Sequence, residues 1–312
     1  MTATFGWLAQ PSVFPWVALV FGLCVGSFLN VVIHRLPKMM EREWLSQAPE
    51  SLEEAESLKG NSDAARVAGE ARALIKPVVE HPLGLVTPRS RCPSCGQGIS
   101  ALQNVPVLSY LFLRGKCANC RTRISLRYPV IELLAGLGAM YCAYRFGFGA
   151  KMLGAAIFLW AVLALAVIDQ ETGFLPDDIT LPLVWAGLLF NIGGAFVPLH
   201  EAVIGAATGY LVLWTVNAVF RAIRGIDGMG YGDFKMTAAV GAFLGWKELL
   251  MVILISSIVG AIFGALQMFG AKRGWDWKFK FHFGPYIAIA GLVAMFWGTQ
   301  LARVYPALRP FS

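Results

Sequence analysis

Long, uninterrupted apolar blocks constrain the fold of this chain more than any other feature of its sequence. About eight blocks have a length and composition suited to crossing a bilayer, and the sixth is the shortest. They cover residues 13–34, 128–146, 152–168, 179–197, 201–220, 234–247, 248–270 and 284–303. Only 14% of the 312 residues are charged, whereas soluble domains carry about 25%. The pattern therefore predicts an all-α polytopic membrane protein with about eight transmembrane helices.

The distribution of positive charge predicts how these helices are oriented. Most of the 26 Lys and Arg residues fall in the segments 35–127, 221–235 and 271–283, which alternation of the helices places on one side. The positive-inside rule makes this side cytoplasmic, so both termini are expected on the outer, periplasmic face. Residues 1–12 lack the positively charged start of a cleavable signal, and the first block is expected to remain as a membrane helix. The net charge of +7 then reflects topology, and no nucleic-acid partner is expected.

Two aspartates at the ends of apolar blocks are candidate catalytic residues. Asp233 follows the glycine-rich sequence Gly228 to Gly232 and precedes the sixth block, while Asp169 ends the third block. The glycines are expected to adopt positive φ and to admit a second chain segment at close range. The predicted topology brings both carboxylates to a similar depth near the cytoplasmic face. Two carboxylates that share one proton can activate a water molecule, as in aspartic proteases.

Simpler interpretations of these charged residues stay open. Asp169 is equally well described as a water-exposed or capping residue at a helix end, whereas the glycine-rich setting of Asp233 favours a catalytic role. Lys235 fits either a lysine that extends to the membrane surface or a charge that tunes the aspartate pair. Asp177 is expected to be the N-cap of the fourth block.

Four cysteines between the first and second blocks form two C-x2-C pairs, Cys92 with Cys95 and Cys117 with Cys120. Four thiolates at this spacing predict a tetrahedral, structural zinc site, with Gly96 allowing the first turn to fold back on the metal. A pair of disulfides is the alternative, and a cytoplasmic location argues against it. The remaining cysteines, Cys24 and Cys142, are interpreted as small residues inside membrane helices.

These features divide the chain into three parts. Residues 1–36 are the first transmembrane helix, residues 37–127 a small cytoplasmic domain with the zinc module at about 89–127, and residues 128–312 the transmembrane peptidase domain. Within the second part, the stretch 46–80 is rich in Glu, Ala and Ser and is expected to be mobile or loosely helical. The aromatic run 275–281 is expected to form an interfacial belt.

One face of the first block is polar, because Ser27, Asn30 and His34 recur at helical spacing. Hydrogen bonding between membrane helices explains such a face. The alternative is the lining of a substrate or cofactor pocket.

The chain carries a series of short motifs in a specific order. They are Gly26 to Pro37, Arg89 to Gly96, Asn104 to Leu111, Arg127-Tyr128-Pro129 with Glu132, Leu175-Pro176-Asp177, Gly228 to Lys235, and Phe283 to Tyr286. Their number and order resemble the prepilin peptidases, the bifunctional leader peptidases and N-methyltransferases of type IV pilus and type II secretion systems. Residues 46–82 match no pattern of that family, and Asp227 stands where its members often have Glu.

The resemblance implies roles for several residues. Asp169 and Asp233 correspond to the two catalytic aspartates, the second within a G-x-G-D-x-K signature. Cys92, Cys95, Cys117 and Cys120 correspond to the tetracysteine zinc module. Gly115 and Lys116 fall where the family has residues linked to methyl transfer.

The resemblance also implies the reaction and its setting. The family, in the bacterial inner membrane, cleaves a basic leader after a glycine on the cytoplasmic side. It then methylates the new N-terminal residue with S-adenosylmethionine. The expected partners are type IV prepilins, type II secretion pseudopilins and membrane lipids.

Two other classes of protein remain as alternatives. A membrane transporter with a zinc-stabilised cytoplasmic domain would carry related halves and polar residues near mid-span, and the sequence has neither. A membrane-tethered zinc ribbon that binds nucleic acid would need aromatic residues that stack on bases, and these are sparse near the cysteines. No G-x-G-x-x-G motif follows a strand, so the sequence predicts no Rossmann-type site for S-adenosylmethionine.

Overall fold

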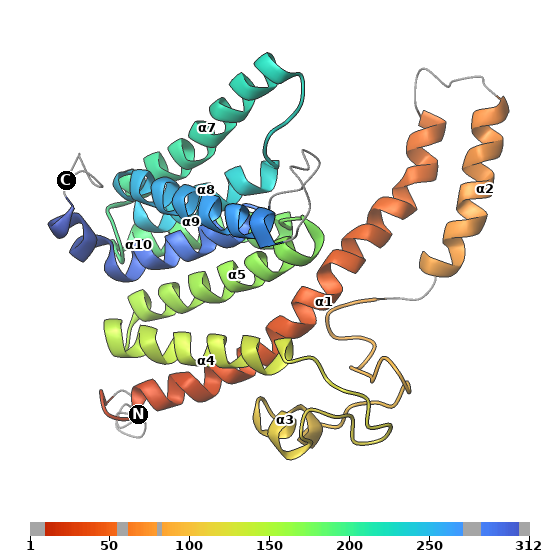
Figure 1. Cartoon of the computed structure of the whole chain (residues 1–312), viewed down its shortest axis with the longest axis horizontal. Coiled ribbons are helices and arrows are strands. Elements are labelled where there is room, and N and C mark those ends of the chain that lie inside the picture. The colour runs from red at the N-terminus through yellow and green to blue at the C-terminus, as the bar shows by residue number, and fades with distance from the viewer. Residues whose placement is uncertain (1–9, 55–61, 80–82, 271–281, 306–312) are drawn as a thin grey trace.

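The structure is a computed structural model that describes residues 10–54, 62–79, 83–270 and 282–305. Over these residues the chain forms helices, loops and two isolated β-bridges, with no strand (Figure 1). The helices are α1 (Phe14–Glu54), α2 (Ser62–Val79), η3 (Leu102–Asn104), α3 (Leu108–Phe112), α4 (Arg127–Phe146), α5 (Ala150–Thr172), α6 (Asp177–Ile192), α7 (Leu199–Arg224), α8 (Tyr231–Leu244), η4 (Trp246–Glu248), α9 (Leu249–Gly270) and α10 (Gly284–Val304). The helical fold class predicted from the apolar blocks is confirmed.

Every predicted apolar block coincides with a helix, from α1 and α4 through α10. Five of the described helices are long and apolar enough to cross a membrane: Phe14–Ser51, Ala150–Thr172, Leu199–Arg224, Trp246–Leu266 and Gly284–Val304. The chain is therefore a membrane protein. Helices α6 and α8 have 16 and 14 residues, or lengths of about 24 and 21 Å. Both are shorter than the hydrocarbon layer of about 30 Å.

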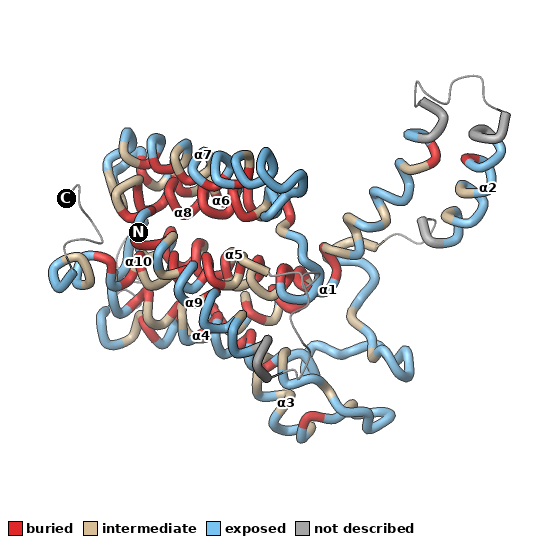
Figure 2. Tube along the Cα trace, turned by 45° about the horizontal axis from the view of Figure 1, so that its top comes forward, coloured by how far each residue is buried: buried red, intermediate tan, exposed pale blue. Residues whose placement is uncertain are grey.

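Helix α8 compensates for its short length by being enclosed in protein. All of its residues from 236 to 244 are buried, and Figure 2 shows this as a continuous red stretch. Helices α6, α7 and α10 pack around it. On the α7 side the contact is between backbones: Gly205 touches Gly241, and a Cβ added at Gly209 would lie 2.7 Å from the Thr237 carbonyl oxygen. Small residues at such a contact let membrane helices approach closely.

The first half of the bundle is built on α1, which packs against α4 and α5. Glycines again make the contact possible. A Cβ added at Gly26 would lie 2.6 Å from the Glu132 Cα atom, and one at Gly22 would lie 2.7 Å from the Ala135 carbonyl oxygen. The α1–α4 interface is therefore as close as the α7–α8 interface.

Helix α1 continues well beyond the membrane. It runs past Pro37 and Pro49 to Glu54, and α2 packs back against it, so the two form a helical hairpin that projects from the bundle (Figure 1). Residue 36, the expected end of the first transmembrane helix, lies inside α1. The stretch 46–80, expected to be mobile or loosely helical, is helical over its described residues. Its Glu and Ala residues have high helix propensity. The low aromatic content of this stretch had instead suggested disorder.

Arg35 ties this helix to the cysteine-containing segment. Arg35 lies in α1 and is buried, and its guanidinium donates to the carbonyl oxygens of Gly84 at 2.8 Å and Pro88 at 2.7 Å. The chain then enters the compact, loop-rich module of residues 89–126. The predicted aromatic belt at 275–281 lies outside the described residues.

Candidate active site and candidate metal centre

Asp169 lies in the last turn of α5 and is only 5% exposed. The C-terminal end of a helix disfavours negative charge. The compensation comes from another helix: Asp169 Oδ2 accepts a hydrogen bond from the backbone N–H of Gly284 at 3.0 Å, and Gly284 is the first residue of α10. A Cβ added at Gly284 would lie 2.7 Å from this oxygen, so the contact requires glycine.

Asp233 lies in the first turn of α8 and is 8% exposed. Its backbone N–H donates to the carbonyl oxygen of Gly230, the N-cap residue. Its Oδ1 atom is buried and has no hydrogen-bond partner among the described residues. Buried carboxylate oxygens are rarely left unpaired. This oxygen is therefore the atom of the site that still needs a hydrogen-bond donor.

The glycines before Asp233 serve close packing. A Cβ added at Gly232 would lie 2.6 Å from the Leu175 Cβ atom, and one at Gly228 would lie 2.8 Å from the Phe220 ring. The expected close approach of a second chain segment is confirmed, with Leu175 as that segment. The expected positive φ is wrong, since none of the three glycines, Gly230 included, adopts it.

Asn217 of α7 organises the loop that leads to Asp233. It is 5% exposed, and its Oδ1 accepts hydrogen bonds from the backbone N–H groups of Gly228 at 2.9 Å and Met229 at 3.1 Å. Its Nδ2 donates to Asp227 Oδ1 at 3.1 Å, and Arg221 lies 3.7 Å from the same oxygen. A single Asn in an apolar helix was the only sequence signal for this role.

Lys235 and Asp177 join two helix starts. The ammonium of Lys235 donates to both carboxylate oxygens of Asp177 at 2.7 Å. The prediction that Asp177 is the N-cap of α6 is wrong: Pro176 occupies that position, and Asp177 is the first helical residue. Its carboxylate is therefore placed to pair with α8 and not with its own backbone.

The arrangement brings Asp169 and Asp233 together from segments far apart in sequence. Their carboxylates are close enough to interact electrostatically. The pair sits where α5 ends and where α6, α8 and α10 begin, and none of these three helices has a side-chain N-cap. Uncapped helix N-termini present free N–H groups and partial positive charge. These helix starts therefore surround the two acids with partial positive charge.

The four cysteines of the two C-x2-C pairs also meet. Their Sγ atoms all lie within 4.8 Å of one another, and Cys92 Sγ is 3.8 Å from Cys120 Sγ. Thiolates arranged tetrahedrally at about 2.3 Å from a zinc ion lie about 3.8 Å apart, while a disulfide requires about 2.05 Å. The donor set of Cys92, Cys95, Cys117 and Cys120 therefore fits a tetrahedral metal ion.

The two knuckles have the same backbone design. The second cysteine of each pair is followed by a residue with positive φ, Gly96 at 70° and Arg121 at 61°. Each knuckle closes with one antiparallel bridge, Arg91 with Gly98 and Lys116 with Arg123. The role predicted for Gly96 in turning the chain is confirmed.

Thiol chemistry in the second knuckle also suits a metal. Cys120 Sγ lies 3.3 Å from the Thr122 hydroxyl, and hydrogen bonding to this hydroxyl lowers the pKa of Cys120 to about 6. A thiolate is the form that binds zinc. Cys24 and Cys142 lie apart from this cluster, in α1 and α4.

Gly115 and Lys116 lie at the edge of the same module. Gly115 is buried with φ of 66°, and a Cβ there would lie 2.7 Å from the Tyr110 hydroxyl. Its position thus has a structural reason independent of any ligand. Lys116 is exposed. Neither residue is brought to the aspartate pair by any hydrogen bond or ion pair of the described residues.

The polar face of α1 takes part in helix packing through Asn30 but not through His34. Asn30 is buried, and its Nδ2 donates to the carbonyl oxygens of Tyr128 at 3.1 Å and Gly26 at 3.2 Å. His34 is exposed and meets Lys38, with 3.0 Å between His34 Nε2 and Lys38 Nζ. Interhelical hydrogen bonding therefore accounts for Asn30 and leaves His34 at the surface.

Two family models match the chain. The model of the bacterial peptidase A24 N-terminal domain covers residues 20–146, and the model described as the type IV leader peptidase family covers residues 156–265. The chain belongs to the type IV leader peptidase family. The second match contains both Asp169 and Asp233, and the first contains all four clustered cysteines.

Curated relatives agree with this membership in the leader peptidase family. Proteins named prepilin leader peptidase/N-methyltransferase are 46% identical in Stutzerimonas stutzeri, 44% in Aeromonas salmonicida and 42% in Pseudomonas aeruginosa. The alignments span 299, 295 and 297 residues and cover between 93% and 95% of each chain. No solved structure gives a match.

Proposed function

We propose that this chain is a membrane-embedded aspartyl endopeptidase and N-methyltransferase of prepilins. It removes the basic leader of type IV prepilins and type II secretion pseudopilins after a glycine and methylates the new N-terminal residue. The names of the relatives and the coverage of the alignments support this function. The single observation that carries the peptidase is the buried pair Asp169 and Asp233, in which Asp233 Oδ1 has no partner among the described residues.

In the proposed mechanism the pair holds one proton. Charge repulsion at short range keeps that proton bound. The ionised carboxylate removes a proton from water, and the resulting nucleophile attacks the scissile carbonyl carbon. The neutral acid donates its proton to the developing oxyanion.

The protein environment positions each part of this pair. The Gly284 N–H group holds Asp169 in one orientation. The buried, unpaired Oδ1 of Asp233 is the atom to which we assign the hydrogen bond from the attacking water. Asn217 and the Lys235–Asp177 ion pair fix the loop and the helix starts on either side.

Methyl transfer uses S-adenosylmethionine, whose sulfonium supplies an electrophilic methyl group. We assign its binding to the neighbourhood of Gly115 and Lys116, where the exposed ammonium of Lys116 suits the carboxylate of the donor's methionine portion. The residues fit this part of the molecule. The role of Gly115 is structural: its positive φ turns the chain after α3 and so positions Lys116.

The metal is Zn2+, held by Cys92, Cys95, Cys117 and Cys120. With four thiolates the coordination is complete, so the ion is structural and takes no part in hydrolysis. Its contribution is to fold residues 89–126, a segment with few buried apolar side chains of its own.

The proposed setting is the bacterial inner membrane, with about eight crossings and both termini periplasmic. The zinc module and the aspartates then face the cytoplasm, where the basic leader lies. Residues 1–36, 37–127 and 128–312 serve as first transmembrane helix, cytoplasmic domain and peptidase domain. Membrane lipids surround the bundle, and nucleic acid has no role.

A mass measurement tests this function. The purified chain is incubated in detergent with a leader-bearing prepilin and S-adenosylmethionine. Loss of the leader followed by the gain of one methyl group is the expected result. An unchanged substrate mass would contradict the proposal and favour the transporter or the nucleic-acid-binding ribbon.

A further inference from the structure

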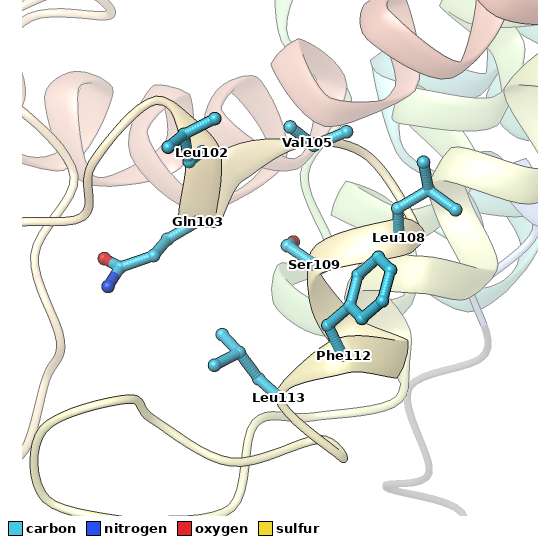
Figure 3. A pocket seen from close by; sticks show the side chains of 7 residues that line it. All are labelled: Leu102, Gln103, Val105, Leu108, Ser109, Phe112 and Leu113. Atoms are coloured by element: carbon cyan, nitrogen blue, oxygen red, sulfur yellow. The ribbon is translucent and has the colours of Figure 1, made fainter.

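An exposed apolar surface covers one side of the cysteine module. It is formed by η3 and α3, and we call it the η3–α3 face. Leu102 and Phe112 are each 84% exposed, Leu111 is 65% exposed and Leu108 is 53% exposed. Between the two short helices lies a pocket of about 390 Å³ (Figure 3), lined by Leu102, Gln103, Val105, Leu108, Ser109, Phe112 and Leu113. Contiguous apolar surface of this kind marks an interaction site.

A buried hydrogen bond fixes the depth of this face along the bundle. The backbone N–H of Val107 donates to Glu132 Oε2 at 2.7 Å, and Glu132 is buried against α1. Glu132 lies in the second turn of α4, about 7.5 Å along the helix from its first residue. If α4 crosses the membrane, as the proposed function has it, the η3–α3 face lies beside the bundle at the level of the membrane surface.

Backbone conformation supports a fixed placement of this loop. Val107 has φ of 60°, a conformation that is unfavourable for a β-branched residue. Such a conformation persists only where its surroundings hold it. Here the Glu132 carboxylate accepts a hydrogen bond from the Val107 N–H. This bond keeps the loop against α4 although the conformation of Val107 is unfavourable.

The segment that contains the face carries charge of one sign. From residue 81 to residue 131 the sequence contains no Asp or Glu. The basic residues nearest in sequence to α3 are all exposed: Arg114, Lys116, Arg121 and Arg123. Exposed apolar side chains in a segment that carries Lys and Arg but no Asp or Glu are typical of surfaces that bind anionic phospholipids at the membrane interface.

We propose that the η3–α3 face is a lipid-binding surface of the cysteine module. Its leucines and Phe112 insert among the acyl chains of the cytoplasmic leaflet, and the neighbouring arginines contact anionic headgroups. The module is thereby held against the membrane beside α4. This inference rests on α4 crossing the membrane, which belongs to the proposed function.

Photo-crosslinking in a bilayer tests the surface. The full chain carries a diazirine amino acid in place of Phe112, or of Ser94 as a control that is also exposed in the module, in nanodiscs of phosphatidylcholine with phosphatidylglycerol. Mass spectrometry is expected to find several-fold more phospholipid adduct at position 112 than at position 94. Equal adduct at both positions, or adducts at 112 that contain another copy of the chain instead of lipid, would overturn the proposal.

The charge part of the surface has its own test. In the variant Arg121→Gln/Arg123→Gln, the lipid adduct at position 112 should lose its preference for phosphatidylglycerol while the zinc content stays unchanged. An unaltered lipid preference would contradict the assigned headgroup contact. Leader removal is measured on the same samples, so that a missing lipid adduct with intact cleavage refutes only the surface, whereas missing cleavage refutes the proposed function.

Discussion

At the scale of single residues, each catalytic candidate is held by a group from a distant part of the chain. Asp169 depends on the N–H of Gly284, which is 115 positions away. The loop before Asp233 depends on Asn217, which supplies an acceptor for two backbone N–H groups. Mutations that remove these supports should therefore affect catalysis without touching either carboxylate.

Gly284→Ala should strongly reduce leader removal. The added Cβ would lie 2.7 Å from Asp169 Oδ2, so the carboxylate must move away from the N–H group that orients it. A misplaced catalytic group commonly costs about 100-fold in rate. The measurement is the initial rate of leader removal by the folded variant. Gly193→Ala is the control, because the nearest atom to its added Cβ is 4.0 Å away; equal rates in the two variants would contradict the role of Gly284.

Asn217→Ala should lower both stability and the rate of leader removal. The Gly228 and Met229 N–H groups lose their acceptor, and each lost hydrogen bond costs about 0.5–1.5 kcal/mol. Thermal unfolding and initial rates are measured in the same detergent.

Asn191→Ala is the matched control for this prediction. Asn191 also accepts from two backbone N–H groups, those of Phe196 and Val197, and donates to the carbonyl oxygens of Ala242 and Phe243 at the other end of α8. The Asn191→Ala variant should be destabilised at least as much, because the hydrogen bonds of Asn191 to α8 are buried, yet it should keep its rate when folded. A loss of rate in both variants would show that Asn217 acts only through stability.

At the scale of elements, α8 is the critical helix, because it is short and carries Asp233 in its first turn. The position of α8 along the bundle is fixed by its backbone contact with α7 at Gly205 and Gly209. The site therefore depends on a helix interface one to three turns away from the chemistry.

Gly205→Ala should destabilise the protein by about 1–3 kcal/mol, the usual cost of overpacking a close interface. The new Cβ would collide with the backbone of Gly241. Chemical unfolding in detergent micelles measures the loss. Gly69→Ala in α2 has open space around the added Cβ and should leave the stability unchanged or slightly raised. Equal stability of the Gly205 and Gly69 variants would refute the close α7–α8 contact.

The cysteine module, which we propose binds zinc, gives a second test at this scale. Cys117→Ser removes one of four ligands, so bound zinc should fall from about one per chain to a small fraction. Metal analysis measures this loss. The module should unfold, because the free energy of metal binding is what stabilises its fold. Methylation should weaken with it. Unchanged methylation in a variant shown to be metal-free would exclude the module from the methyl-transfer site.

The sequence predicted the elements better than their connections. Apolar blocks locate the membrane helices because burial in lipid selects for them directly, and the cysteine spacing locates the four-cysteine cluster because a knuckle is a local structure. The continuation of α1 to Glu54 was not foreseen, since a proline at position 37 normally ends a helix. The roles of Asn217 and Gly284 depend on contacts between distant segments, which no local pattern encodes.

At the scale of the whole molecule, the bundle gathers its reactive groups at one end. Helix α5 ends there and α6, α8 and α10 begin there, so aspartates from two segments meet three helix N-termini. The cysteine module joins α1 to α4 and is tied to them through Arg35 and Glu132. In the proposed topology this end faces the cytoplasm, where a basic leader is accessible and the apolar stem of the substrate remains in the bilayer.

The most direct test compares three proteins in one mass measurement: the unmodified chain, Asp169→Asn and Asp233→Asn, each reconstituted with a leader-bearing prepilin. Asp178→Asn is the control, an exposed aspartate at the start of α6. We expect complete leader removal by the unmodified chain and by the control, and an uncleaved substrate with either of the other variants, although both insert normally. Full processing by Asp169→Asn or by Asp233→Asn would contradict the two-aspartate mechanism.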